Sequence, residues 1–214
     1  MTPRGQHRHR PARPSWATYR RSIGDRSGLF AALARDWAPA RALYPGSYLD
    51  ASPSTAIPSV TYLDTDRRAA RYFADHELVA TELEGRTRPG AGADIQFLHA
   101  DYTTPLDLPR GGFDLLISLY AGPAWDHCRP YLTRGGLFLA NTSHGDASLA
   151  ALDPRLELVH AVLHDEDEYR LDSTALESHL IPKSPEAADP DLIRSTGRGV
   201  TYTRTAFAYV FRLT

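Results

Sequence analysis

The stretch FDLLISLYAGPAWDHCRPYLTRGGLFLANTS, residues 113–143, decides the fold that we expect for this chain. It opens with an almost unbroken apolar run at 113–120, which is typical of a parallel strand covered on both faces. Residues 122–136 predict a helix that ends at their last two residues, both glycine. Residues 137–143 predict a second strand. Strand, helix and strand in this order indicate a parallel sheet with right-handed connections.

The same alternation continues toward the N-terminus. Three further strands are predicted at 41–44, 59–64 and 94–101. Helices are predicted at 28–40 and 65–85, because apolar side chains recur there at helical spacing. We therefore expect an α/β fold in which helices cover both faces of one sheet.

Beyond residue 143 strands and helices no longer alternate regularly. A short helix is predicted at 145–153 and a sixth strand at 156–164. The chain closes with alternating aromatic and aliphatic residues at 204–214, which predict a last strand. Between them, residues 165–199 are acidic, interrupted by prolines and irregular. They are interpreted as either a substrate-facing insertion or a long surface excursion.

Composition narrows the classes of protein to consider. The net charge of −2 gives no basic excess for nucleic-acid binding, and no apolar run is long enough to cross a bilayer. Cys128 is the only cysteine, which excludes an intrachain disulfide and argues against a thiolate metal site. Residues 1–14, rich in Arg, His and Pro, predict a disordered basic tail before a single domain at 15–214. We expect a cytoplasmic protein without membrane partners.

Polar residues follow three of the predicted strands, where open α/β sheets bind their ligands. Gly46 permits a tight turn and a close approach of the backbone to a ligand. Asp64 could accept hydrogen bonds from both hydroxyls of a ribose, and Asp101 could bond the edge of an adenine that packs on Tyr102. Each of these residues also has an ordinary interpretation, as a turn glycine, a helix cap or a loop residue.

The combination resembles the class I S-adenosylmethionine-dependent methyltransferases. Their glycine turn corresponds to ALYPGSYLD at 42–50, and the acids that end their second and third strands correspond to Asp64 and Asp101. The segment PYLTRGGLFLANTS at 130–143 is similar to the passage L-x-x-G-G into the fifth strand of that family.

The resemblance covers roughly residues 29–163 and 200–214. It implies a Rossmann-like methyltransferase fold, with a mostly parallel seven-stranded sheet, an antiparallel C-terminal strand and helices on both faces.

The resemblance also implies a cofactor, S-adenosylmethionine. In the glycine turn Tyr44 stands where the family usually has an acid, and Tyr48 takes the place of the second glycine. Asp50 could supply the missing carboxylate for the ammonium group of the methionine moiety. The cofactor-binding residues expected on this basis are Gly46, Ser47, Asp50, Asp64, Asp101 and Tyr102.

No catalytic residue or metal site is assigned. His127 and His144 have no visible partner, and the acids of HDEDEY at 164–169 are typical of a solvated surface. Positioning alone can promote transfer from an activated sulfonium, so methyl transfer to a small molecule is the main hypothesis. One alternative is a catalytically inactive scaffold or interaction module of the same fold. The other, a nicotinamide-dependent oxidoreductase, is disfavoured because G-x-G-x-x-G is missing.

Overall fold

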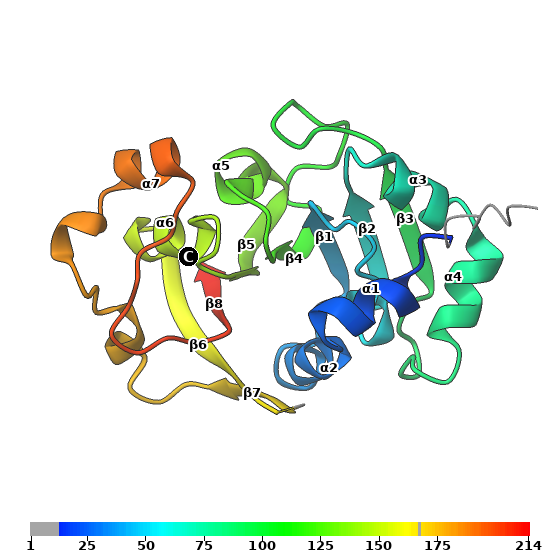
Figure 1. The fold of residues 1–214 in the computed structure, drawn as a ribbon, viewed down its shortest axis with the longest axis horizontal. Coiled ribbons are helices and arrows are strands. Elements are labelled where there is room, and N and C mark those ends of the chain that lie inside the picture. Colours follow the sequence, from blue (N-terminus) through cyan, green and yellow to red (C-terminus); the bar gives the residue numbers. More distant parts are fainter. Residues whose placement is uncertain (1–12, 167) are drawn as a thin grey trace, which may run out of the picture.

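The computed structural model describes residues 13–166 and 168–214, and eight strands in this part of the chain form one sheet (Figure 1). The strands are β1 (Arg41–Pro45), β2 (Ser59–Leu63), β3 (Asp94–Leu98), β4 (Phe113–Ser118), β5 (Leu132–Ala140), β6 (Leu156–Asp165), β7 (Glu168–Asp172) and β8 (Ala208–Leu213). Their spatial order is β3-β2-β1-β4-β5-β8-β6-β7. Strands β1 to β5 run parallel, and β8 lies antiparallel between β5 and β6.

This topology confirms the predicted fold class, but the number of strands is eight and not seven. The additional strand, β7, pairs antiparallel with β6 over residues 161–165 and 168–172. Asp165, Glu166 and Glu168 therefore lie in a β-hairpin. Its pairing is supported by the rings of His164 and Tyr169, which stack with their centroids 4.1 Å apart.

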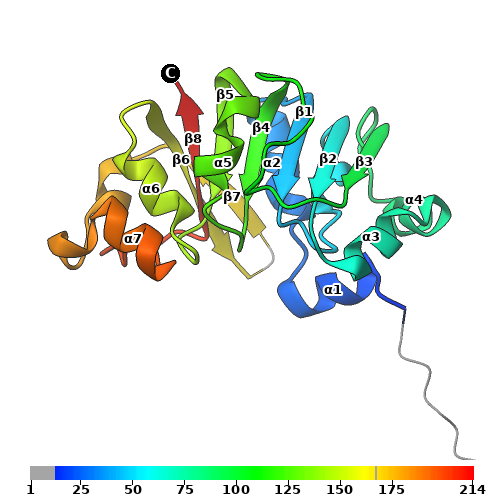
Figure 2. The same cartoon turned by 90° about the horizontal axis from the view of Figure 1, so that it is seen from above.

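Helices cover both faces of the sheet (Figures 1 and 2). Helices α2 to α4 contribute to one core cluster and α5 to α7 to the other. Across the sheet, a register row of apolar residues, Leu43, Leu116, Phe138 and Phe211, belongs to the second cluster. The helices are α1 (Trp16–Ile23), α2 (Ser27–Asp36), α3 (Arg67–Phe73), α4 (His76–Leu83), α5 (Ala124–Cys128), α6 (Asp146–Leu152) and α7 (Pro190–Thr196).

Two predicted helices have different bounds in the structure. The helix expected at 65–85 is interrupted, because the Asp75 carboxylate caps a new helix by accepting from Leu78 N. The helix expected at 122–136 is shorter, since β5 already begins at Leu132. Gly135 and Gly136 lie inside that strand, where the register with β4 shifts and where a Cβ on Gly136 would meet Leu132 Cδ1 at 2.8 Å. The glycines thus form a bulge and not a helix end.

The predicted basic tail and the irregular segment 165–199 differ in how much of each the structure describes. Residues 1–12 of the predicted tail lie outside the described residues. Residues 165–199 contain β7, two short 3-10 turns and α7, whose Ile193 is buried against α6. In the described part of the chain, every helix is too short or too polar to pass through a membrane.

Helix α1 was not predicted, and it lies beyond the arrowheads of β1 and β2, beside α3 (Figure 2). Trp16 anchors it, because the indole is fully buried and the Trp16 backbone N–H donates to Glu82 Oε2 at 2.9 Å. The guanidinium groups of Arg20 and Arg86 lie 4.9 and 5.9 Å from the indole ring centre. One aromatic side chain therefore holds α1 over the carboxyl edge of the sheet.

We expect Trp16→Ala to lower the free energy of unfolding by about 3–5 kcal/mol, the usual cost of truncating a buried aromatic side chain. Urea denaturation followed by circular dichroism measures this change. Arg21→Ala, an exposed change in the same helix, is the control and should stay close to the wild-type value. Equal stability of both variants would show that Trp16 does not anchor α1.

Candidate functional site

Gly46 follows β1 directly and joins two loops at the carboxyl edge of the sheet. Its φ is +64°, and its N–H donates to the Leu63 carbonyl at the end of β2 (2.8 Å). A Cβ at this position would lie 2.5 Å from Cβ of Ala121, in the loop after β4, and 3.9 Å from Tyr102 Cε1. Glycine is required here both for its backbone conformation and for the space that a side chain would occupy.

Asp64 directly follows β2 and holds the glycine turn in place. Its Oδ2 accepts from Tyr48 N (2.7 Å) and its Oδ1 accepts from Asp66 N (2.8 Å). The side chain is half-buried, and each carboxylate oxygen has a second lone pair. Asp64 therefore lies where sequence analysis expected a ribose-binding acid, with capacity for further hydrogen bonds.

Asp50 has a different role from the one expected. It is fully buried, and Oδ2 pairs with Arg26 Nη1 (2.9 Å) and accepts from the Tyr44 hydroxyl (3.2 Å). The other oxygen, Oδ1, accepts from Ser52 N (3.1 Å) and from the Ser52 hydroxyl. The expected contact of Asp50 with a methionine ammonium is replaced by this internal network, which links the turn to the start of α2.

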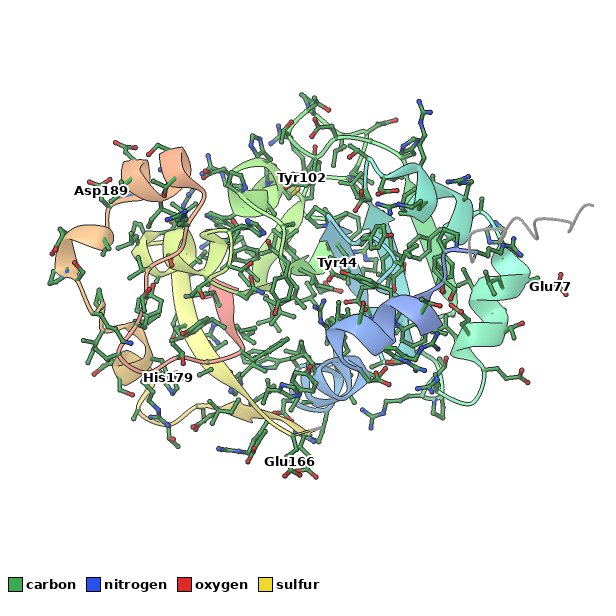
Figure 3. The ribbon with its side chains drawn as sticks, viewed as in Figure 1. Tyr44, Glu77, Tyr102, Glu166, His179 and Asp189 are labelled. Atoms are coloured by element: carbon green, nitrogen blue, oxygen red, sulfur yellow. The ribbon has the colours of Figure 1, made fainter. Side chains whose placement is uncertain are left out.

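Tyr44 shares the network that surrounds Asp50. Its ring is buried at β1 (Figure 3), and burial, followed by the nearby Asp50 charge, raises the pKa of the phenol well above its usual range. The tyrosine that replaces the family's acid is thus a neutral hydrogen-bond donor to Asp50.

Tyr48 turns its ring away from the glycine turn. Its φ is +46°, and the ring packs edge-on against Tyr19, with centroids 4.9 Å apart. The Arg68 guanidinium lies 5.1 Å from the Tyr48 ring centre. The neighbouring Ser47 is buried, and its hydroxyl has no hydrogen-bond partner among the described residues. Tyr48 therefore contributes its main chain to the turn and its ring to the surface of α1 and α3.

Asp101 and Tyr102 follow β3 and differ in how they are placed. Asp101 is exposed, and Oδ1 accepts from Thr103 N (2.8 Å) and Thr103 Oγ1 (2.7 Å), bonds that lower the pKa of the carboxyl. Tyr102 is half-buried, and its hydroxyl donates to the Gly122 carbonyl (3.2 Å) beside α5 (Figure 3). Tyr102 therefore borders Gly46 and the loop after β4, whereas Asp101 stabilises its own turn.

Asp146, at the start of α6, was missed by sequence analysis. It is fully buried, and its Oδ2 accepts from the Ser118 hydroxyl (2.5 Å) and from Ala124 N (2.8 Å). Its Oδ1 accepts from Trp125 N (3.2 Å), so one carboxyl fixes both ends of the loop between β4 and α5. Burial raises its pKa to about 6. An aspartate after a glycine at a helix start is a common pattern, and nothing in the sequence signalled its partners.

Among the described residues, the side chains at this edge form no cluster suited to acid–base catalysis or to metal binding. His127 and His144 are both exposed, and His127 is tilted against Tyr102 with ring centroids 6.4 Å apart. Among residues 13–166 and 168–214 no group of three or more His, Cys, Asp or Glu side chains could hold a metal ion. The arrangement can accept hydrogen bonds from a hydroxylated ligand and position it, and it offers no evident general base.

Comparison with known proteins shows the fold. No protein-family model and no curated protein matches the sequence. The structure of the 16S rRNA methylase RmtB is similar with a TM-score of 0.51 and 13% identity, over 92% of this chain and 66% of that one. The O-methyltransferase TomG from Streptomyces achromogenes, solved with S-adenosylmethionine, has a TM-score of 0.45 and 15% identity over 68% of this chain and 76% of its own.

A third similar structure, the YcgJ protein from Bacillus subtilis, has a TM-score of 0.42 and 19% identity over 55% of this chain. The match spans only 50% of the length of YcgJ. Together with the strand order, the likeness to RmtB shows that this chain has the Rossmann-like fold of the class I methyltransferases.

We expect Gly46→Ala to destabilise the protein more than Gly197→Ala. Both glycines have a φ near +60°, but nothing lies within 4 Å of a Cβ on Gly197, so that variant measures backbone strain alone. The contact with Ala121 should add about 1–3 kcal/mol, as overpacking does elsewhere. Urea denaturation measures the free energy of unfolding of both variants. Equal losses would show that the loop after β4 moves aside without cost.

The pH dependence of stability should report on Asp146. Because its pKa is raised to about 6 in the folded protein, from an ordinary 3.8, the folded state binds more protons between these values. Stability should therefore fall as the pH rises from 4 to 7, by up to about 3 kcal/mol. Asp146→Asn should remove this slope in denaturation curves, whereas the exposed Asp191→Asn should retain it. An unchanged slope in Asp146→Asn would contradict the assignment.

Proposed function

We propose that this chain, which has the class I methyltransferase fold, is an S-adenosylmethionine-dependent methyltransferase acting on a small-molecule acceptor. One observation carries the proposal. A half-buried carboxylate, Asp64, is held by two backbone N–H groups at the end of β2, facing a positive-φ glycine turn at the end of β1. This is the placement that a ribose-binding acid requires in an open α/β sheet.

The residues at the edge fit the adenosyl half of the cofactor. Asp64 would accept from the ribose hydroxyls, and Tyr102 with the backbone at Asp101 would border the adenine. The buried Ser47 hydroxyl, unpartnered among the described residues, supplies a polar group for the ligand in the glycine turn. When bound, the cofactor supplies a methyl group on an activated sulfonium. The chain itself binds, orients and excludes water, which suits an edge without an evident base.

This chain differs from the class I methyltransferase pattern in the residues that would bind the methionine moiety of S-adenosylmethionine. Asp50 is neutralised by Arg26 and is not available for an ammonium group, so the cofactor-binding residues that we propose do not include it. Main-chain carbonyl groups of the turn are the remaining acceptors that we propose for that group. The loss of a charged partner supports weak binding of the cofactor.

The alternative function is a catalytically inactive scaffold of the same fold. The observation that favours it is the close approach of Ala121 to Gly46, which fills the space beside the glycine turn. Internal neutralisation of Asp50 supports the same interpretation. The two functions differ on one measurable property of the wild-type protein, its affinity for the cofactor.

The proposal also covers the methyl acceptor and the location of the protein in the cell. The similar structure of RmtB is named as a 16S rRNA methylase, whereas the present chain has a net charge of −2 and lacks an overall basic excess. This charge supports a small acceptor and not a nucleic acid. We propose a cytoplasmic location.

Calorimetric titration with S-adenosylmethionine and S-adenosylhomocysteine tests the proposal. We expect weak but measurable binding to the wild type, and a loss of about 2–4 kcal/mol in Asp64→Ala, since hydrogen bonds to charged groups contribute about 1.5–3 kcal/mol each. Asp94→Asn changes an exposed acid at the opposite end of the paired strands and should bind as the wild type does.

Three other outcomes have distinct meanings. No binding to a folded wild type supports the scaffold, and binding of NAD in place of both ligands supports an oxidoreductase. Unchanged affinity in a folded Asp64→Ala variant removes Asp64 from the site.

A further inference from the structure

A basic pocket opens between α1 and α3, beside the glycine turn. Its volume is about 600 Å³, within the range of small-molecule sites. Three arginines line it, Arg13, Arg68 and Arg71, together with hydroxyl groups of α1 and the rings of Tyr19 and Tyr48. No acidic side chain is among the described residues that line it. None of the roles considered above uses this pocket.

The arginines of the pocket keep unused hydrogen-bond donors. Arg71 donates only from Nε, to the Arg67 carbonyl at 3.2 Å, and has no ion pair among the described residues. Arg68 uses Nε and Nη2 on Asp66, which leaves the remaining guanidinium nitrogen without a partner in the part of the chain described. Since a guanidinium has five N–H donors, this pair retains most of its capacity.

The acids near the pocket already have structural roles. Asp66 accepts from Arg68 N at the start of α3, and Asp75 accepts from Leu78 N at the start of α4. Asp75 also pairs with Arg13. Both carboxylates lie outside the lining and each pairs with one of its arginines, so Arg71 is the lining cation that no acid among the described residues neutralises.

We propose that this pocket binds the phosphate group of a small phosphorylated molecule, a phosphomonoester with an apolar or aromatic body. Guanidinium groups match the oxygens of a phosphate, and the Thr18 hydroxyl, which accepts from Ser15 Oγ and Arg21 Nη2, has no acceptor for its own O–H among the described residues and adds a neutral donor. The Tyr19 and Tyr48 rings give one apolar wall. A concave site of this size on a chain of net charge −2 suits a small anion better than a polynucleotide.

The proposal does not rest on methyltransferase activity, so it is tested without S-adenosylmethionine. Phenyl phosphate and phenol are titrated by calorimetry into the wild type, Arg71→Gln and Arg67→Gln. Arg67 is exposed on the same helix and does not line the pocket, which makes it a matched control for the loss of one positive charge. Thermal unfolding verifies that all three proteins are folded.

We expect phenyl phosphate to bind the wild type, phenol not to bind, and the affinity for phenyl phosphate to fall at least tenfold in Arg71→Gln. Arg67→Gln should stay within about twofold of the wild type, since it changes only long-range, screened charge. Equal weakening in both variants, or equal binding of phenol, would overturn the proposal. So would a single-stranded oligonucleotide that binds tightly and is not displaced by phenyl phosphate, since the surface would then be a polynucleotide interface.

Discussion

The buried ion pair between Arg26 and Asp50 is the interaction on which the carboxyl edge depends. Its atoms lie 2.9 Å apart, and both side chains are at most 3% exposed. Losing either partner would leave an uncompensated charge in the core, which costs far more than an exposed pair is worth. Because the pair joins the start of α2 to the segment after the glycine turn, it sets the path of residues 46–50. That path brings Tyr48 N to the carboxylate of Asp64.

A second set of anchors fixes the loop after β4 against this turn. The loop is held by the Tyr102 hydroxyl at Gly122, by Asn141 Oδ1 at Tyr120 N (3.4 Å) and by the buried carboxyl of Asp146. Ala121 therefore meets Gly46 at a set position. The edge of the sheet is built from two loops, each with its own buried carboxyl, that are packed directly on each other.

Sequence patterns predicted the parts of this structure that depend on local periodicity. Apolar runs located β1 to β6 and β8, and the position of Asp64 followed from the end of its strand. Two local patterns were misleading. The pair of glycines taken for a helix end forms a bulge in β5, and the acidic segment taken for a solvated surface contributes to the β6–β7 hairpin. The partners of Asp50 and Asp146 could not be predicted, because Arg26 is 24 residues from Asp50 and Ser118 is 28 from Asp146. Long-range polar pairs have no periodicity to detect.

Tyr48 contacts two different parts of the molecule, one through its backbone amide and one through its ring. Its amide is bound to Asp64 and its ring lies between Tyr19 and Arg68, so one residue is shared by the carboxyl edge of the sheet and the basic pocket. Its backbone lies in the left-handed region, at φ +46°, and its amide and its ring contact different elements. By thermodynamic reciprocity, a ligand that shifts this residue from one side changes the affinity on the other side by a factor that is the same in both directions. A ligand that shifts Tyr48 at one of these surfaces would therefore be coupled to a ligand bound at the other.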